Sequence, residues 1–120
     1  MHSARLLAYF QDTRFAGELP APALRVDISN PACGDMLRLT ARFEGDRVAE
    51  ARFQVRGCTA SIATAAALTE WMEGKSIAEL RALSASAIEE AVGGLEPASK
   101  HAAALCADGV KRLLDILKSK

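Results

Sequence analysis

The sequence lacks long hydrophobic runs, a surplus of either charge and an even number of cysteines. No segment approaches the ~20 consecutive apolar residues that cross a bilayer, and the apolar stretch near the N-terminus is too short for a signal peptide. Lys plus Arg and Asp plus Glu number 15 each, so no basic face is indicated for nucleic acid or a membrane surface. We therefore expect no nucleic-acid or membrane partner, and a cytoplasmic location.

The cysteine count and the length also limit the class of protein. Three cysteines cannot form a fully paired disulfide framework, which leaves metal ligation, sulfur chemistry or packing as their uses. The 120 residues, half of them hydrophobic and a quarter charged, suit one ordinary globular domain with one core. We expect a single domain over residues 1–120.

Alternating apolar and polar residues predict a β-hairpin in the middle of the chain. The alternation runs over residues 37–43, stops at the turn sequence 44–46 and resumes over residues 49–55. A shorter alternation at residues 24–28 predicts a further strand. One face of this antiparallel sheet should be buried, because only one set of alternate residues is apolar.

Helical patterns flank these strands. Residues 3–11 predict a short amphipathic helix, and the alanine-rich residues 59–72 predict a helix that packs closely on the sheet. Shorter helices are expected at 76–83 and 84–92, and a last one from near Pro97 to the C-terminus. Strands grouped before helices predict an α+β fold, a three-stranded antiparallel sheet with helices packed on one face.

Cys33 and Asp35 lie in the turn sequence NPACGD, residues 30–35, just before the hairpin. Two residues apart in a bend, they can converge on one ion, and a thiolate with a carboxylate suits Zn²⁺ or iron. The alternative is a turn with an incidental cysteine, because Pro and Gly form turns in many contexts.

Cys58 lies where the hairpin ends and the alanine-rich helix begins. A helix N-terminus favours a thiolate, which makes such a cysteine a better nucleophile and metal ligand. The alternative is a small buried side chain. Antiparallel pairing brings the start of the first hairpin strand and the end of the second to one edge of the sheet. Cys33, Asp35 and Cys58 are therefore predicted to converge there.

These motifs together resemble a known family. The turn sequence at 30–35, Gly57-Cys58, and the sequences TEW at 69–71 and GKS at 74–76 are similar to iron–sulfur cluster assembly scaffolds of the IscU/NifU type. The resemblance runs from about Tyr9 to the C-terminus, in the order that the family has.

The resemblance implies a scaffold or carrier and not an enzyme. In this family a cysteine desulfurase delivers sulfur, a [2Fe–2S] cluster forms with iron, and the cluster passes to recipient apo-proteins. Cys33 and Cys58 would then be ligands and sulfur acceptors. Asp35 would be a weaker oxygen ligand that keeps the cluster, or a Zn²⁺ ion in its place, labile.

The sequence departs from the family near the last helix. His101 aligns with the family histidine, but Ala102 stands where the third cysteine is expected. Cys106 lies one turn further on, ~5–6 Å away on the same helix face; it is either a core residue or a replacement ligand. His101 is either a surface residue or a fourth ligand that completes a tetrahedral zinc set. The segment that an Hsp70-type chaperone reads in the family is degraded at 96–100, which leaves that partner open.

Two alternatives to the scaffold function remain. The chain could be a divergent zinc-binding or regulatory docking module of the same machinery. It could also be a zinc-dependent sulfur acceptor that turns over desulfurase persulfide, although no general base is evident beyond His101.

Overall fold

A three-stranded antiparallel sheet forms the first layer of the fold. The computed structural model describes residues 2–30 and 34–119. Within them the strands are β1 (Leu24–Asn30), β2 (Asp35–Glu44) and β3 (Arg47–Arg56), in the order β1-β2-β3. Both pairings are antiparallel, with β2 in the centre. The predicted hairpin and its additional strand are confirmed.

Helices form the second layer, and their positions follow the sequence patterns closely. The elements are α1 (Ala4–Gln11), α2 (Thr59–Met72), α3 (Ile77–Ala82), α4 (Ala85–Ala91) and α5 (Lys100–Lys118), the last preceded by a 3₁₀ turn at Pro97–Ser99. Ser3, Ser76 and Ser84 cap α1, α3 and α4 through their side chains. Of the helices in the described ranges, none combines the length and hydrophobicity needed to cross a bilayer.

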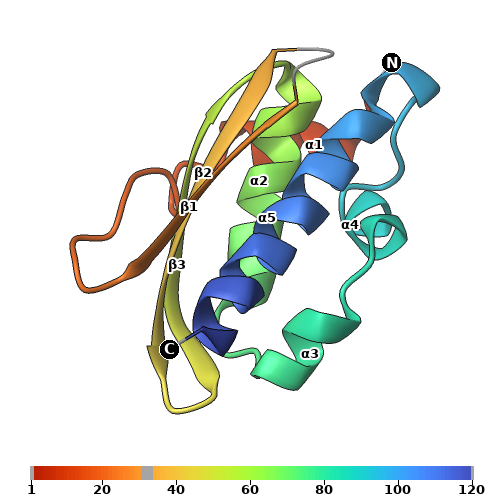
Figure 1. Cartoon of the computed structure of the whole chain (residues 1–120). Coiled ribbons are helices and arrows are strands. Elements are labelled where there is room, and N and C mark those ends of the chain that lie inside the picture. The colour runs from red at the N-terminus through yellow and green to blue at the C-terminus, as the bar shows by residue number, and fades with distance from the viewer. Residues whose placement is uncertain (1, 31–33, 120) are drawn as a thin grey trace.

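The helices cover one face of the sheet, as predicted (Figure 1). The core contains Leu37 and Leu39 of β2 together with Cys106 and Leu113 of α5. Gly109 allows α5 to approach closely, because a Cβ atom there would lie 3.2 Å from Leu37 Cδ2. Helix α2 is buried on most sides because it packs against β3, α1 and α5. Its alanines permit this close contact.

The strands are longer than the alternation indicated. Pairing of Asn30 with Asp35 carries the β1–β2 ladder to both residues, so Asp35 is the first residue of β2. The expectation that Asp35 lies in a bend outside the strand was therefore wrong. The physical reason is cross-strand backbone pairing, which a residue-by-residue pattern does not contain. This pairing fixes where the Asp35 side chain is presented.

Candidate metal centre

The candidate site lies at the end of the sheet where β2 begins and β3 finishes. Asp35 opens β2, and its neighbour Met36 pairs with Arg56, the last residue of β3. Gly57 follows, and Cys58 is the N-cap of α2. His101 comes from the first turn of α5. Three elements that are distant in sequence thus supply one side chain each.

The donor atoms of these three side chains are close together. His101 Nε2 lies 3.1 Å from Asp35 Oδ2 and 3.9 Å from Cys58 Sγ. One ligand atom from each residue falls within 4.8 Å of the others. Asp35 and Cys58 therefore lie together as predicted, and His101, which the sequence left as a surface residue or a fourth ligand, lies beside them. Metal ligation by these residues stays a prediction.

Ser61 connects two of these groups. Its hydroxyl donates a short hydrogen bond to Asp35 Oδ2, and its Oγ lies 3.4 Å from Cys58 Sγ. Asp35 and Ser61 are buried, with 5% and 1% of their surface exposed, whereas Cys58 is exposed and His101 is partly exposed. The site is thus anchored inside the protein and open to solvent on its cysteine side.

The electrostatics of the site favour a thiolate. Partial burial raises the pKa of Cys58, but hydrogen bonds with the Ser61 side chain and backbone and with His101 outweigh it, so the pKa is lowered. Burial lowers the pKa of His101, but Cys58 and the charge of Asp35 outweigh burial and raise it. An activated thiolate beside an imidazole is a good nucleophile and a good ligand for soft metal ions.

Of the other predicted site residues, one lies in the hydrophobic core and one lies outside the described residues. Cys33 lies outside the described residues. Ala102, at the position of the expected third cysteine, is fully buried in a small cluster with Leu6 and Val92. Cys106 is 1% exposed in the main core, and its Sγ donates to Thr64 Oγ1 at 3.7 Å. Its surroundings match the core alternative, and Cys106 is not part of the group formed by Asp35, Cys58 and His101.

The burial of Cys106 leads to a prediction about thiol reactivity. Burial raises the pKa of this thiol to about 12, so it stays protonated and shielded up to about pH 10. In a Cys33→Ser/Cys58→Ser variant, we expect a thiol reagent such as DTNB to label Cys106 at pH 8 only after unfolding. Stoichiometric absorbance assays with and without denaturant measure this. Rapid labelling of the folded variant would contradict a core position and make Cys106 available as a ligand.

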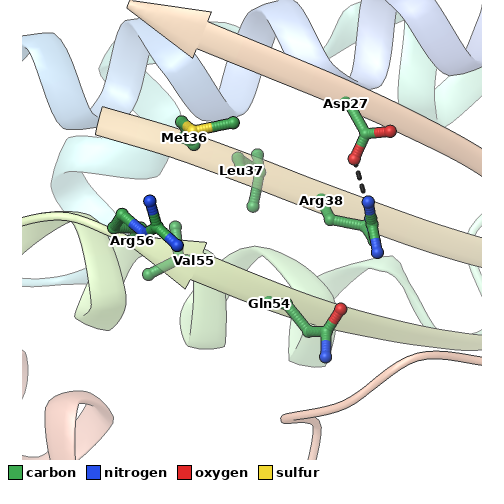
Figure 2. A pocket seen from close by; sticks show the side chains of 7 residues that line it. All are labelled: Asp27, Met36, Leu37, Arg38, Gln54, Val55 and Arg56. Carbon is green, nitrogen blue, oxygen red and sulfur yellow. Dashed lines mark hydrogen bonds and ion pairs between the residues drawn. The ribbon is translucent and has the colours of Figure 1, made fainter. Parts of the chain in front are cut away.

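A shallow hollow lies beside the site on the exposed side of the strands. Figure 2 shows that Asp27 and Arg38 form an ion pair within it. Arg38 Nε and Asp27 Oδ1 are 2.8 Å apart. Its lining residues are Asp27, Met36, Leu37, Arg38, Gln54, Val55 and Arg56. None of them is a cysteine or histidine, so this hollow lacks the thiolate and imidazole ligands that Cys58 and His101 offer in the neighbouring site.

Comparison with known proteins identifies the family. The model of the family described as "NifU-like N terminal domain" matches residues 1–119. The chain belongs to this family. A relative in Archaeoglobus fulgidus, named iron–sulfur cluster assembly scaffold protein IscU 1, is 32% identical over 114 residues, which cover 95% of this chain and 74% of the relative. The IscU scaffold protein of Escherichia coli K12 is 30% identical over 123 residues, covering 99% and 95%.

Solved structures support the fold of this NifU-like domain. The N-terminal part of a NifU-like protein from Brucella abortus superposes with a TM-score of 0.79 at 18% identity, covering 98% of this chain and 94% of that one. A SufU protein from Fervidobacterium islandicum gives a TM-score of 0.77 at 21% identity, covering 94% and 96%. At these identities the likeness shows the fold alone. The predicted sheet-and-helix arrangement of the family is confirmed.

Sequence reasoning found the ligand candidates of this domain but not the residues that hold them. The hydrogen bond from the Ser61 hydroxyl to Asp35 was not foreseen. Gly57 was noted only as part of a motif, although a Cβ atom there would lie 2.8 Å from Asp35 Cγ. The available signal was the spacing of Gly57, Cys58 and Ser61, which places two small residues around the helix start.

Proposed function

We propose that this NifU-like domain is a scaffold on which an iron–sulfur cluster is assembled. The observation that carries the proposal is the convergence of Asp35, Cys58 and His101 from three elements. Cys33, two residues before Asp35, is proposed as the second thiolate. Relatives named as iron–sulfur cluster assembly scaffold proteins, aligned over nearly the whole chain, support the same function.

The donor set fits a thiophilic metal ion. Ligands of a tetrahedral zinc ion lie about 3.3–3.8 Å from one another when the metal–ligand distances are the usual ~2.0–2.3 Å. The separations of 3.1 Å and 3.9 Å from His101 Nε2 to Asp35 and Cys58 bracket this range. Thiolate and imidazole suit iron and zinc, while the carboxylate is a harder and weaker ligand. The cluster is cargo in this proposal, and weak oxygen ligation favours its release.

A cysteine desulfurase is the proposed sulfur donor, and apo-proteins that need clusters are the proposed recipients. Cys58 suits sulfur acceptance because it is exposed and its pKa is lowered, against the opposing effect of burial, by Ser61 and His101. A nucleophilic thiolate at the surface can attack a desulfurase persulfide, taking the outer sulfur while the desulfurase thiolate leaves. Free thiols of this kind require a reducing compartment, which agrees with a cytoplasmic location.

Anaerobic reconstitution tests the scaffold proposal. The protein is incubated with ferrous iron, cysteine, a cysteine desulfurase and dithiothreitol, the thiol reductant that converts the delivered persulfide sulfur to sulfide. We expect the visible sulfide-to-iron absorption of a [2Fe–2S] cluster, followed by transfer to an apo-ferredoxin. Cys33→Ser should abolish the absorption if this residue is a ligand. If the protein gains no such absorption, the scaffold function is wrong. If Cys33→Ser and Cys58→Ser both assemble clusters normally, the proposed thiolate ligands are wrong.

A zinc-dependent function is the second candidate, and two observations favour it. Ala102 stands where the family resemblance implies a third thiolate, and the imidazole of His101 lies beside Asp35 and Cys58, so the site has the mixed ligands of a zinc centre. Protein purified without added iron would then contain one zinc ion per chain. If it acts as a sulfur acceptor, the zinc form should accelerate desulfurase turnover. A docking module would bind the desulfurase and leave its rate unchanged.

A further inference from the structure

Asp35 is a buried carboxylate, and only some of its hydrogen-bond partners could still donate to it once a metal ion binds. Among the described residues its partners are His101 and Ser61, both at Oδ2. His101 Nε2 is itself a candidate ligand, so a metal ion would take that nitrogen away from Asp35. A buried carboxylate needs a remaining donor. Ser61, which is outside the group of candidate ligands, is the donor that stays available.

The bond from Ser61 is not the usual one for a hydroxyl within a helix. Thr64 and Thr69, on the same helix α2, bond to helix carbonyls three and four residues earlier. Such back-bonding is the common arrangement for Ser and Thr inside helices. The Ser61 hydroxyl instead reaches across 26 residues of sequence to Asp35. The Ser61 hydroxyl is therefore oriented toward the Asp35 carboxylate and not toward a carbonyl of its own helix.

Gly57 supplies the space that the carboxylate occupies. A Cβ atom at Gly57 would lie 2.8 Å from Asp35 Cγ and Oδ1, closer than real Cβ atoms approach, and 3.1 Å from Oδ2. The backbone of Gly57 is not in the left-handed region that requires glycine, unlike Gly34 with φ +76°. Space for Asp35 therefore explains glycine at position 57, immediately before Cys58.

We propose that Ser61 and Gly57 are positioning residues that hold the Asp35 carboxylate as a metal ligand beside Cys58 and His101. Ser61 fixes the carboxylate by a hydrogen bond, and Gly57 leaves the volume in which it sits. The inference rests on the metal binding proposed above and adds residues to it that are not ligands. Hydrogen-bonded supports of ligating carboxylates commonly change metal affinity by ~10–100-fold when removed.

The test compares Ser61→Ala and Gly57→Ala with the unaltered protein and with a matched control. Thr69→Ala is the control, because Thr69 is a fully buried hydroxyl on α2 that bonds Ala65 and Ala66 and does not contact the site. Each protein is titrated anaerobically with Co²⁺ alone, and the d–d and sulfur-to-cobalt bands report affinity and coordination. Thermal unfolding of the metal-free proteins reports the integrity of the fold.

We expect ~10–100-fold weaker Co²⁺ binding and altered d–d bands in both site variants. Thr69→Ala should keep the native affinity and spectrum even where it lowers the melting temperature. Native Co²⁺ affinity and spectrum in both Ser61→Ala and Gly57→Ala would overturn the positioning role while leaving the metal site intact. A loss of Co²⁺ affinity in Thr69→Ala as large as in the site variants would overturn it as well. Absence of Co²⁺ binding by the unaltered protein would overturn both this role and the proposed site. If Ser61→Ala does not fold, Gly57→Ala alone decides.

Discussion

Cys58→Ser is expected to weaken Zn²⁺ binding by more than ~100-fold and to prevent stable cluster assembly. The change removes the thiolate that lies at the N-terminus of α2, within reach of both Asp35 and His101. A serine hydroxyl stays protonated at neutral pH and is a poor ligand for zinc or iron. Loss of a direct ligand should exceed the ~10–100-fold effect of losing a group that only supports a ligand. Competition with a chromophoric chelator measures the affinity.

Cys106→Ala is the matched control for that experiment. It removes a thiol of the same kind from the main core, where Thr64 is its hydrogen-bond partner. Among the described residues, Cys106 is not part of the group formed by Asp35, Cys58 and His101. Zinc affinity should be native, and only the stability should fall. A native affinity in Cys58→Ser would contradict the assignment of the site, and a large affinity loss in Cys106→Ala would instead support Cys106 as the replacement ligand.

Local patterns predicted most of the fold. The alternation in residues 37–55 determines which side of the hairpin is apolar, and the observed pairing of Leu39 with Phe53 and Val26 follows from it. Helix α2 begins and ends where predicted, at Thr59 and Met72, because the strand pattern stops before it and Gly74 follows it. These features depend on neighbours in the sequence, so the sequence reveals them directly.

The candidate site was less predictable because tertiary packing assembles it. Hairpin pairing explains why Asp35 and Cys58 meet, and this could be argued from topology alone. His101 lies 66 residues after Asp35, and its position depends on how α5 crosses the sheet. Its role was proposed from a family resemblance, since no periodicity distinguishes a lone histidine. The bond between Ser61 and Asp35 depends on rotamers and close packing, which no sequence pattern specifies.

The position of α5 determines whether His101 reaches the site. We expect this position to depend on the contact between Gly109 of α5 and Leu37 of β2. Leu37→Ala is expected to lower the free energy of unfolding by about 2–5 kcal/mol, because Leu37 is 1% exposed and its loss leaves a cavity. Gly109→Ala should gain about 0.5–1 kcal/mol of helix propensity. In the native background crowding offsets this gain, since the new Cβ atom would lie 3.2 Å from Leu37 Cδ2.

In the Leu37→Ala background the same Gly109→Ala change should be plainly stabilising, because the clash is gone and the added methyl group fills part of the cavity. Urea unfolding of the metal-free single and double variants forms a double-mutant cycle, and we expect a favourable coupling of at least about 0.5 kcal/mol. Met36→Ala is the control on the same strand, since Met36 is 47% exposed and should show no coupling with Gly109. Additive effects of Leu37→Ala and Gly109→Ala would mean that this contact does not set the approach of α5 to the sheet.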